Sequence, residues 1–185
     1  MAAREGRTVQ VTSLAPNAKE PLMNAVSTVT PTPRIAVRAA LAEHLPEVHR
    51  MLVALAAHHG DTATIAPNRL AQLCLEGDEV GALVALLPDS PARHPVGYAL
   101  VTRHTDLISG GIRQDITHLY VQPPFRGMGI GRALIAAATE QAVTDSVLGL
   151  TIGTHPENAA AAAAYRHLGL TDLPAPGPRF AVPLG

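Results

Sequence analysis

The 185-residue chain is poor in cysteine, in aromatic residues and in charged residues. It contains one cysteine, Cys74, no tryptophan, 3 tyrosines and 2 phenylalanines, and only 16% of its residues are charged. A single thiol can form neither an intramolecular disulfide nor the paired cysteines of a zinc site. This cysteine usage is typical of proteins in a reducing compartment, so we expect a cytoplasmic location.

The charge and the hydropathy pattern exclude two classes of partner. The formal net charge is −1, so there is no basic excess that would draw the chain onto nucleic acid or an anionic membrane. No apolar run approaches the roughly 18 residues of a membrane-spanning helix, and the first residues lack the continuous apolar stretch of a secretory signal. We therefore expect neither nucleic acid nor a membrane as a partner.

The length fits one folded domain with some chain to spare. Residues 1–33 are rich in threonine, serine, proline and alanine without a sustained period, which predicts a flexible N-terminal arm before a single domain at residues 34–185. Apolar patterns predict strands at residues 34–38, 80–87, 96–101, 115–121, 148–154 and 179–184. Helical periodicity predicts helices beginning near residues 45, 67, 131 and 155. The order β-α-α-β-β-β-α-β-α-β predicts an α/β fold whose mixed, mostly antiparallel sheet has helices on both faces.

A glycine-rich turn follows the predicted strand that ends at Val121. Its sequence is Arg126-Gly127-Met128-Gly129-Ile130-Gly131-Arg132. Residues without side chains let successive backbone N–H groups face an anion, and the start of a helix adds partial positive charge. A nucleoside triphosphate loop would need lysine after Gly131, and a dinucleotide fingerprint would need glycine in place of Arg132. The turn therefore predicts a phosphate site of another kind, which the two arginines flank.

A second block lies near the C-terminal end of the predicted domain. Thr154 and Glu157 have the spacing of a capping box, which predicts a helix start near His155. Asn158 and Tyr165 are two helical turns apart, so we expect both on one face, with only alanines between them on that face. Small residues there let a cofactor approach the helix closely.

These two blocks resemble the GNAT superfamily of N-acetyltransferases. Residues 119–131 match the family's apolar strand, proline and Arg/Gln-x-x-Gly-x-Gly/Ala pattern, and residues 155–170 match its Asn-x-x-Ala-x-x-x-Tyr-x-x-x-Gly-Phe/Leu element. The likeness covers about residues 34–184. It implies an acetyl-CoA-dependent N-acetyltransferase that acylates a primary amine of a small molecule or peptide directly. Dimerisation is common in the family, so the resemblance also carries a homodimer as an expectation.

The resemblance also implies a role for particular residues. The pyrophosphate of coenzyme A is expected on the turn formed by Arg126, Gly127, Met128, Gly129, Ile130, Gly131 and Arg132. The Leu119 N–H is expected to face the thioester oxygen, while the backbone of Tyr120 and Val121 holds the pantetheine arm. Asn158 is expected to bind the cofactor, and the Tyr165 hydroxyl is expected to protonate the leaving sulfur.

The general base is less clearly marked. Part of the family uses a carboxylate two or four residues before the position of Leu119; Thr117 occupies the nearer place and Asp115 the farther. Strand alternation puts Asp115 on the face of Leu119 and His118 on the opposite face, unless a bulge exchanges them. We expect Asp115 first and His118 second. Because Thr117 departs from the family pattern, a non-catalytic acyl-CoA-binding or sensing module of the same fold is the alternative.

The patterns around the remaining histidines and Cys74 predict neither a metal site nor a nucleophile. The histidines at positions 44, 49, 58 and 59 show no His-Glu-x-x-His or paired-cysteine spacing, so no metal is expected. Cys74 lies between two leucines in a helical pattern and is expected to be a small buried apolar residue instead of a nucleophile.

Overall fold

The computed structural model describes residues 35–88 and 94–174. The predicted arm at residues 1–33 and the predicted closing strand at residues 179–184 lie outside this part of the chain. Both therefore stay predictions.

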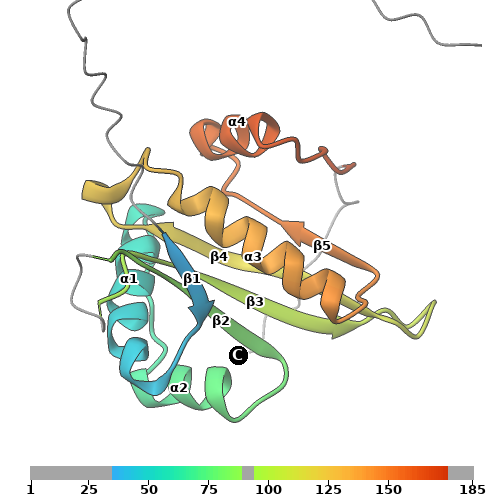
Figure 1. The fold of residues 1–185 in the computed structure, drawn as a ribbon, viewed down its shortest axis with the longest axis horizontal. Coiled ribbons are helices and arrows are strands. Elements are labelled where there is room, and N and C mark those ends of the chain that lie inside the picture. The colour runs from blue at the N-terminus through green and yellow to red at the C-terminus, as the bar shows by residue number, and fades with distance from the viewer. Residues whose placement is uncertain (1–34, 89–93, 175–185) are drawn as a thin grey trace, which may run out of the picture. The chain divides into compact units, whose positions relative to one another are not determined.

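Within the described residues the core is a five-stranded sheet in the order β1-β2-β3-β4-β5 (Figure 1). The first three pairings are antiparallel and the pairing of β4 with β5 is parallel. The fold class predicted from the sequence is confirmed. The strands are β1 (Ala36–Ala39), β2 (Val80–Leu86), β3 (Gly97–Thr105), β4 (Ile112–Val121) and β5 (Gly149–Ile152).

The hairpin of β3 and β4 is longer than the apolar pattern predicted. Polar residues continue the pairing outward, with Arg103 opposite Gln114 and His104 opposite Arg113. The Asp106 carboxylate holds the turn, because it accepts hydrogen bonds from two backbone N–H groups of the turn and from the Arg113 side chain at 2.8 Å. These bonds hold the pKa of Asp106 at about 2. The hairpin projects at one end of the molecule (Figure 1).

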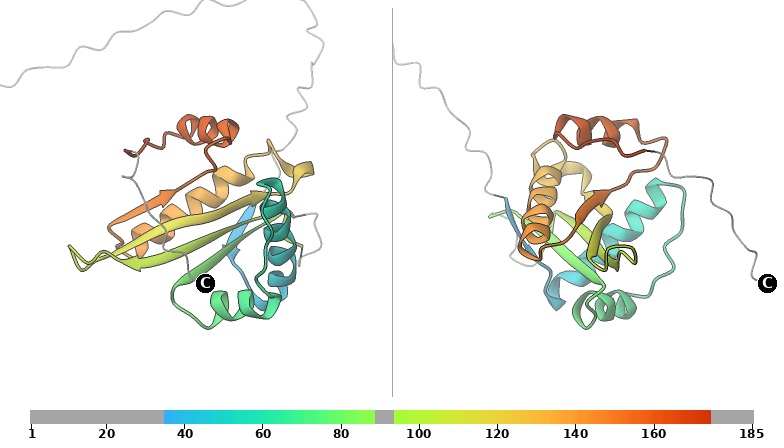
Figure 2. Two further views of the ribbon diagram at one scale, coloured as in Figure 1. Left: turned by 180° about the vertical axis from the view of Figure 1, so that it is seen from behind. Right: turned by 90° about the vertical axis from the view of Figure 1, so that its right-hand side faces the viewer.

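Helices cover both faces of the sheet (Figure 2). α1 begins with Pro46 in its first turn and ends just before Gly60, whose φ of +76° suits glycine, while α2 begins at a proline. Short 3-10 helices, η1 (Ala42–His44) and η2 (Pro123–Phe125), precede α1 and the glycine turn. The α-helices are α1 (Leu45–His58), α2 (Pro67–Leu75), α3 (Ile130–Thr144) and α4 (Ala159–His167).

The two faces of the sheet have separate hydrophobic clusters. Tyr98, Leu100 and Tyr120 pack with side chains of α1 and α2. Val101 and Ile116 pack with side chains of α3, and part of α4 borders this second cluster. The faces are called here the α1 face and the α3 face.

A β-bulge interrupts the alternation of β4. Leu100 pairs with His118 and the next residue, Val101, pairs with Ile116, so Thr117 is the extra residue. Because Ile116 and Leu119 both border the α3-face cluster, Asp115 and His118 both point to the α1 face. The expectation from simple alternation, that Asp115 shares a face with Leu119 and not with His118, is therefore wrong.

α4 starts later than the sequence predicted. The proposed capping box of Thr154 and Glu157 does not form, and Asn158 is the N-cap, accepting a hydrogen bond from the Ala161 N–H at 3.0 Å. Before it, the His155 ring accepts a bond from the Glu157 N–H at 3.3 Å. Such local side-chain bonds compete with helix formation, and here they keep the residues before Asn158 in a turn.

The α3 face provides a test of this packing. Replacing Leu134, which is 0% exposed, with alanine should lower the free energy of unfolding by about 2–5 kcal/mol, because it leaves a cavity under the sheet. Val143 on the same helix is 74% exposed, so Val143→Ala should change stability by less than about 0.5 kcal/mol. Urea denaturation of both variants measures the difference, and equal losses would contradict the assigned core.

Candidate functional site

The site lies where β4 and β5 part. β5 pairs with β4 only between Arg113 and Ile116, although β4 continues to Val121. Beyond Ile116 no described strand pairs with the β5-facing edge of β4. This leaves a gap, open on the carboxyl side of both strands, which is the usual place for a ligand in α/β sheets.

The hydrogen bonds at the end of β4 show which backbone groups face the gap. The Gln122 N–H donates to the Val96 carbonyl, toward β3, whereas the Val121 carbonyl points away from β3 and accepts from the Arg126 side chain at 3.0 Å. Alternation then turns the N–H and C=O of Leu119 and Val121 into the gap, while those of Tyr120 point toward β3. Of the three backbone positions predicted to hold the thioester and pantetheine, Leu119 and Val121 therefore have groups that face the gap, and the Val121 carbonyl is bonded there to Arg126.

The glycine turn continues directly from this edge. Gly127 and Gly129 have φ of +77° and +82°, the left-handed region that favours glycine, and Gly129 is the N-cap of α3. A Cβ placed on Gly127, Gly129 or Gly131 would meet no atom within 4 Å. The turn is thus exposed, and no side chain caps the first N–H groups of α3. Its shape suits an external anion.

The two arginines of the turn are placed differently. Arg126 lies across the end of β4, with its guanidinium 5.5 Å from the centre of the Tyr120 ring. Arg132, on the first turn of α3, is exposed. Both cations lie beside the N-terminus of α3, where they add to its positive potential.

A contact between distant residues fixes the strand that leads into the turn. The Gln122 side chain donates to the buried Glu47 carboxylate of α1 at 2.9 Å and to the Pro95 carbonyl at 3.1 Å. Arg50, one turn along α1, also pairs with Glu47. The sequence reasoning missed this contact, because no local pattern links residues 75 positions apart.

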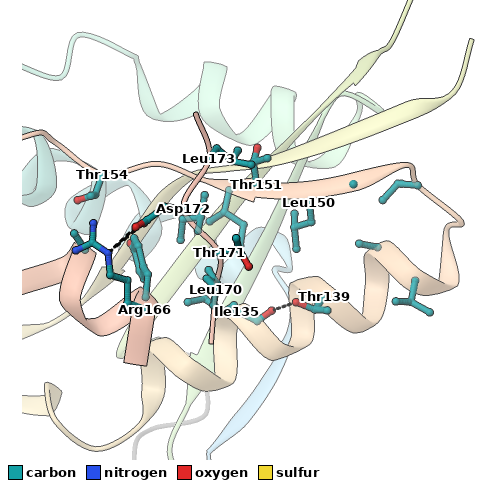
Figure 3. Close-up of a pocket in the computed structure, with 18 residues that line it drawn as sticks. Ile135, Thr139, Leu150, Thr151, Thr154, Arg166, Leu170, Thr171, Asp172 and Leu173 are labelled. Atoms are coloured by element: carbon teal, nitrogen blue, oxygen red, sulfur yellow. Dashed lines mark hydrogen bonds and ion pairs between the residues drawn. The ribbon is translucent and has the colours of Figure 1, made fainter. Parts of the chain in front are cut away.

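A cavity of about 720 Å³ lies on the α3 face, between α3, β5 and α4 (Figure 3). Its walls are mainly apolar, and residues 170–173 line one side, where Arg166 pairs with Asp172 at 2.9 Å. Tyr165, Thr154 and Ile152 are among the residues that line the cavity. Burial raises the pKa of Tyr165, so its hydroxyl carries a proton at neutral pH. The sequence pattern did not predict this cavity.

Asn158 and Tyr165 both belong to the α4 segment, but Asn158 has a structural task. Its side-chain oxygen caps α4 by the bond to Ala161. The amide NH₂ of Asn158 and the second lone pair of its side-chain oxygen are left for a ligand.

The two base candidates lie on the α1 face at different positions along β4. The Asp115 carboxylate accepts a hydrogen bond from the Thr151 hydroxyl at 2.8 Å, within the part where β4 and β5 are paired. His118 comes after the bulge, directly before Leu119 and alongside the gap. Burial lowers the pKa of His118, and repulsion from His59 lowers it further, so the imidazole is neutral at neutral pH.

Cys74 has a structural position in the fold. It packs against the α1-face cluster, and burial raises its pKa, which disfavours the reactive thiolate.

Among residues 35–88 and 94–174 no three ligating side chains gather where they could hold a metal ion. In the same stretch of chain no helix combines the length and the apolar character needed to cross a membrane.

Several solved structures with this fold are named as acetyltransferases. An aminoglycoside acetyltransferase from an uncultured soil metagenomic sample, in complex with sisomicin, superposes with a TM-score of 0.67 at 15% identity, covering 80% of this chain and 97% of that one. The AAC(6')-Iy enzyme in complex with a coenzyme A–acetylneamine bisubstrate analogue gives 0.66 at 19% identity, covering 80% and 99%. A ribosomal-protein-alanine N-acetyltransferase from Brucella melitensis gives 0.61 at 20% identity, covering 79% and 99%.

The sequence matches no curated protein, but it matches a family model. That model describes the acetyltransferase (GNAT) family, and it covers residues 45–170, from the start of α1 to just beyond α4. The match includes the free edge of β4, the glycine turn and Tyr165. The chain belongs to the GNAT acetyltransferase family.

Proposed function

We propose that this protein is an N-acetyltransferase that moves the acetyl group of acetyl-CoA directly onto a primary amine of a small molecule or peptide. The observation that carries the proposal is the free edge of β4 running without a break into the exposed glycine turn. An extended pantetheine arm can pair with such an edge as an added strand, while the diphosphate binds at the helix start. The family membership and the coenzyme A analogue bound to one structural neighbour support this choice of donor.

The chain is proposed to bind the acetyl donor, acetyl-CoA, mainly through backbone groups and less through side chains. The N–H groups from Gly127 to Arg132 bind the diphosphate oxygens, and the two arginines of the turn add charge-assisted bonds. The free Leu119 N–H polarises the thioester carbonyl and stabilises the oxyanion that forms when the amine attacks. The Val121 carbonyl accepts from the pantetheine arm once the Arg126 side chain turns to the phosphates.

Two side chains move protons. The Tyr165 hydroxyl donates a proton to the departing thiolate, a role that suits a phenol whose pKa is raised by burial. For the base we now favour His118 over Asp115, because His118 is neutral at neutral pH and lies beside the gap, whereas the Asp115 carboxylate is held by Thr151. The amine approaches on the α1 face, to which His118 points.

The acceptor class follows from the family's chemistry. Structural neighbours include enzymes named for aminoglycoside and for ribosomal-protein alanine substrates, so an amine is the common feature. A reducing, cytoplasmic compartment is part of the proposal and is supported by the single cysteine of this chain.

The glycine turn provides the first functional test. Gly131→Glu should weaken coenzyme A binding at least tenfold, because an acidic side chain would occupy the space of the diphosphate and repel it. The fold should tolerate the change, since a Cβ at Gly131 meets no protein atom and acidic residues suit helix starts. Ala136→Glu adds the same charge at an exposed site further along α3 and should leave affinity unchanged. Calorimetric titration with coenzyme A decides, and equal affinities in both variants would refute the phosphate site.

Tyr165 provides the second test and separates the enzyme from the sensing module. Tyr165→Phe should lower kcat by about 10²–10⁴-fold, as expected for loss of a general acid, with coenzyme A affinity retained. Thiol release from acetyl-CoA across a panel of primary amines measures kcat, and calorimetry measures affinity. A wild-type protein that binds coenzyme A tightly yet acetylates no amine would support the non-catalytic alternative. Full activity in Tyr165→Phe would remove the acid role alone.

A further inference from the structure

The cavity on the α3 face is apolar but poorly covered. Two residues that line it, Val143 of α3 and Leu173 after α4, are 74% and 70% exposed, which places them among the most exposed large apolar residues of the described chain. No residue of β5 or α4 is buried, although side chains of both border the α3-face cluster. Water contact with so much apolar surface is unfavourable, so this surface calls for a covering segment.

The strand beside the cavity also has a free edge. β5 is the last strand in the sheet order, and among the described residues only β4 pairs with it. An edge strand presents unpaired N–H and C=O groups, which an added strand can pair. The residues of β5, Gly149–Ile152, all line the cavity. A strand with apolar side chains on one face would therefore satisfy the edge and the cavity together.

The polar groups that line the cavity are largely used within the protein. The Thr139 hydroxyl donates to a carbonyl of its own helix at 2.9 Å, and the Thr151 hydroxyl donates to the Asp115 carboxylate at 2.8 Å. Arg166 is paired with Asp172. A site for a small polar molecule needs free polar groups that fix its orientation. The lining instead favours hydrocarbon side chains as the occupant.

The C-terminal segment of this chain has the required pattern. It continues from Pro174, directly after the residues 170–173 that line the cavity. In residues 179–184 the large apolar side chains are Phe180, Val182 and Leu184, and smaller or polar residues alternate with them. Because side chains of a strand alternate between its two faces, these three share one face of an extended segment.

Pro183 fits a strand that is paired on one side only. Proline has no N–H, so it is tolerated in a strand where its backbone faces away from the neighbouring strand. Backbone groups of successive residues point to opposite sides of a strand. With Pro183 facing away from β5, the N–H groups of Val182 and Leu184 face toward it. Those are residues whose side chains form the apolar face.

The connection is long enough for this arrangement. The chain from Pro174 to Phe180 spans up to roughly 20 Å when extended, since each residue adds about 3.3–3.6 Å. A strand with the 4 residues of β5 is about 13 Å long. Pro176 and Gly177 form a dipeptide that marks a turn, so the chain can reverse its direction there. The segment can thus reach every part of β5 and of the cavity.

We propose that residues 179–184 add to the free edge of β5 and close the cavity on the α3 face, with the side chains of Phe180, Val182 and Leu184 inside it. The occupant is the C-terminal segment of the same chain. Since Tyr165 lines the cavity, the segment also positions α4 and this tyrosine. That last step rests on the proposed function, in which Tyr165 is the general acid.

NMR on the full-length protein tests the contact directly. The chain has 2 phenylalanines, so selective labelling leaves two rings to assign, and Phe125→Leu identifies the signals of Phe180. The Phe180 ring should show nuclear Overhauser effects to methyl groups of the cavity, such as those of Leu150 and Ile152. A mixed sample of labelled and unlabelled chains shows whether the contact forms within one molecule or between two copies.

A matched pair of glutamate variants tests the consequence. Val182→Glu puts a charge on the face that enters the cavity, where burial is costly, whereas Ala181→Glu puts the same charge on the opposite face. Val182→Glu should expel the segment, so that fluorescence of the dye anilinonaphthalene sulfonate rises several-fold. Its kcat should fall about tenfold or more through misplacement of Tyr165, with coenzyme A affinity retained. Ala181→Glu should match the wild type in all three measurements.

The outcomes separate this proposal from the proposed function. Contacts of the Phe180 ring with the cavity inside one molecule, together with the expected response of Val182→Glu, support it. Absence of these contacts overturns it, as do contacts found only between copies or equal dye binding by both glutamate variants. Unchanged kcat in Val182→Glu despite raised dye binding overturns the positioning of Tyr165. A wild-type protein that shows the contacts but acetylates no amine of a panel refutes the proposed function, while the placement of the segment stands.

Discussion

The parting of β4 from β5 after Ile116 is the constraint on which the rest of the site depends. Parallel strands need a crossover connection, and α3 supplies it here. The crossover begins where β4 ends, so the start of α3 with its open N–H groups lies beside the free edge of the strand. The glycine turn and the free strand edge, proposed to hold the diphosphate and the pantetheine arm, are therefore joined by topology, and the Arg126 side chain bridges them through its bond to the Val121 carbonyl.

The bulge at Thr117 then decides what each side of the sheet can do. Without the extra residue, His118 would lie on the α3 face with Ile116, and Leu119 would lie on the α1 face. With it, Leu119 keeps its side chain in the α3-face cluster, while His118 and Asp115 both point to the α1 face. The two base candidates thus lie on the α1 face, whereas Tyr165, proposed as the general acid, borders the α3-face cluster. One inserted residue places both base candidates on the side of the sheet opposite to Leu119.

How far the sequence predicted this arrangement depends on how local each feature is. The path from the end of β4 through the glycine turn into α3 is continuous in sequence, and its elements were predicted correctly. The start of α4 was wrong, because the Thr154–Glu157 spacing competes with Asn158, and only the folded chain shows that Asn158 accepts the Ala161 N–H. The sequence analysis left a bulge open as an alternative. The identity of a residue within a strand does not show whether that residue pairs with the neighbouring strand.

Contacts between distant segments were beyond the sequence for a different reason. Nothing in the local pattern relates Gln122 to Glu47, or His59 to His155, because these pairs form only when α1 has packed on the sheet. The spacing of the histidines in the sequence predicted only that they do not form a metal site. The position of His59 beside His155 became visible only with the packing.

A neutral imidazole suits the proposed role of base on the acceptor side better than a carboxylate does. An amine arrives as a cation, and a carboxylate beside it would bind the charge tightly and hold the proton on nitrogen. A half-buried imidazole offers little attraction to the cation, and because His118 is neutral at neutral pH it has a nitrogen available to accept the proton. At the proposed site, weak binding of the ammonium form and an available acceptor for its proton thus come from one choice of side chain.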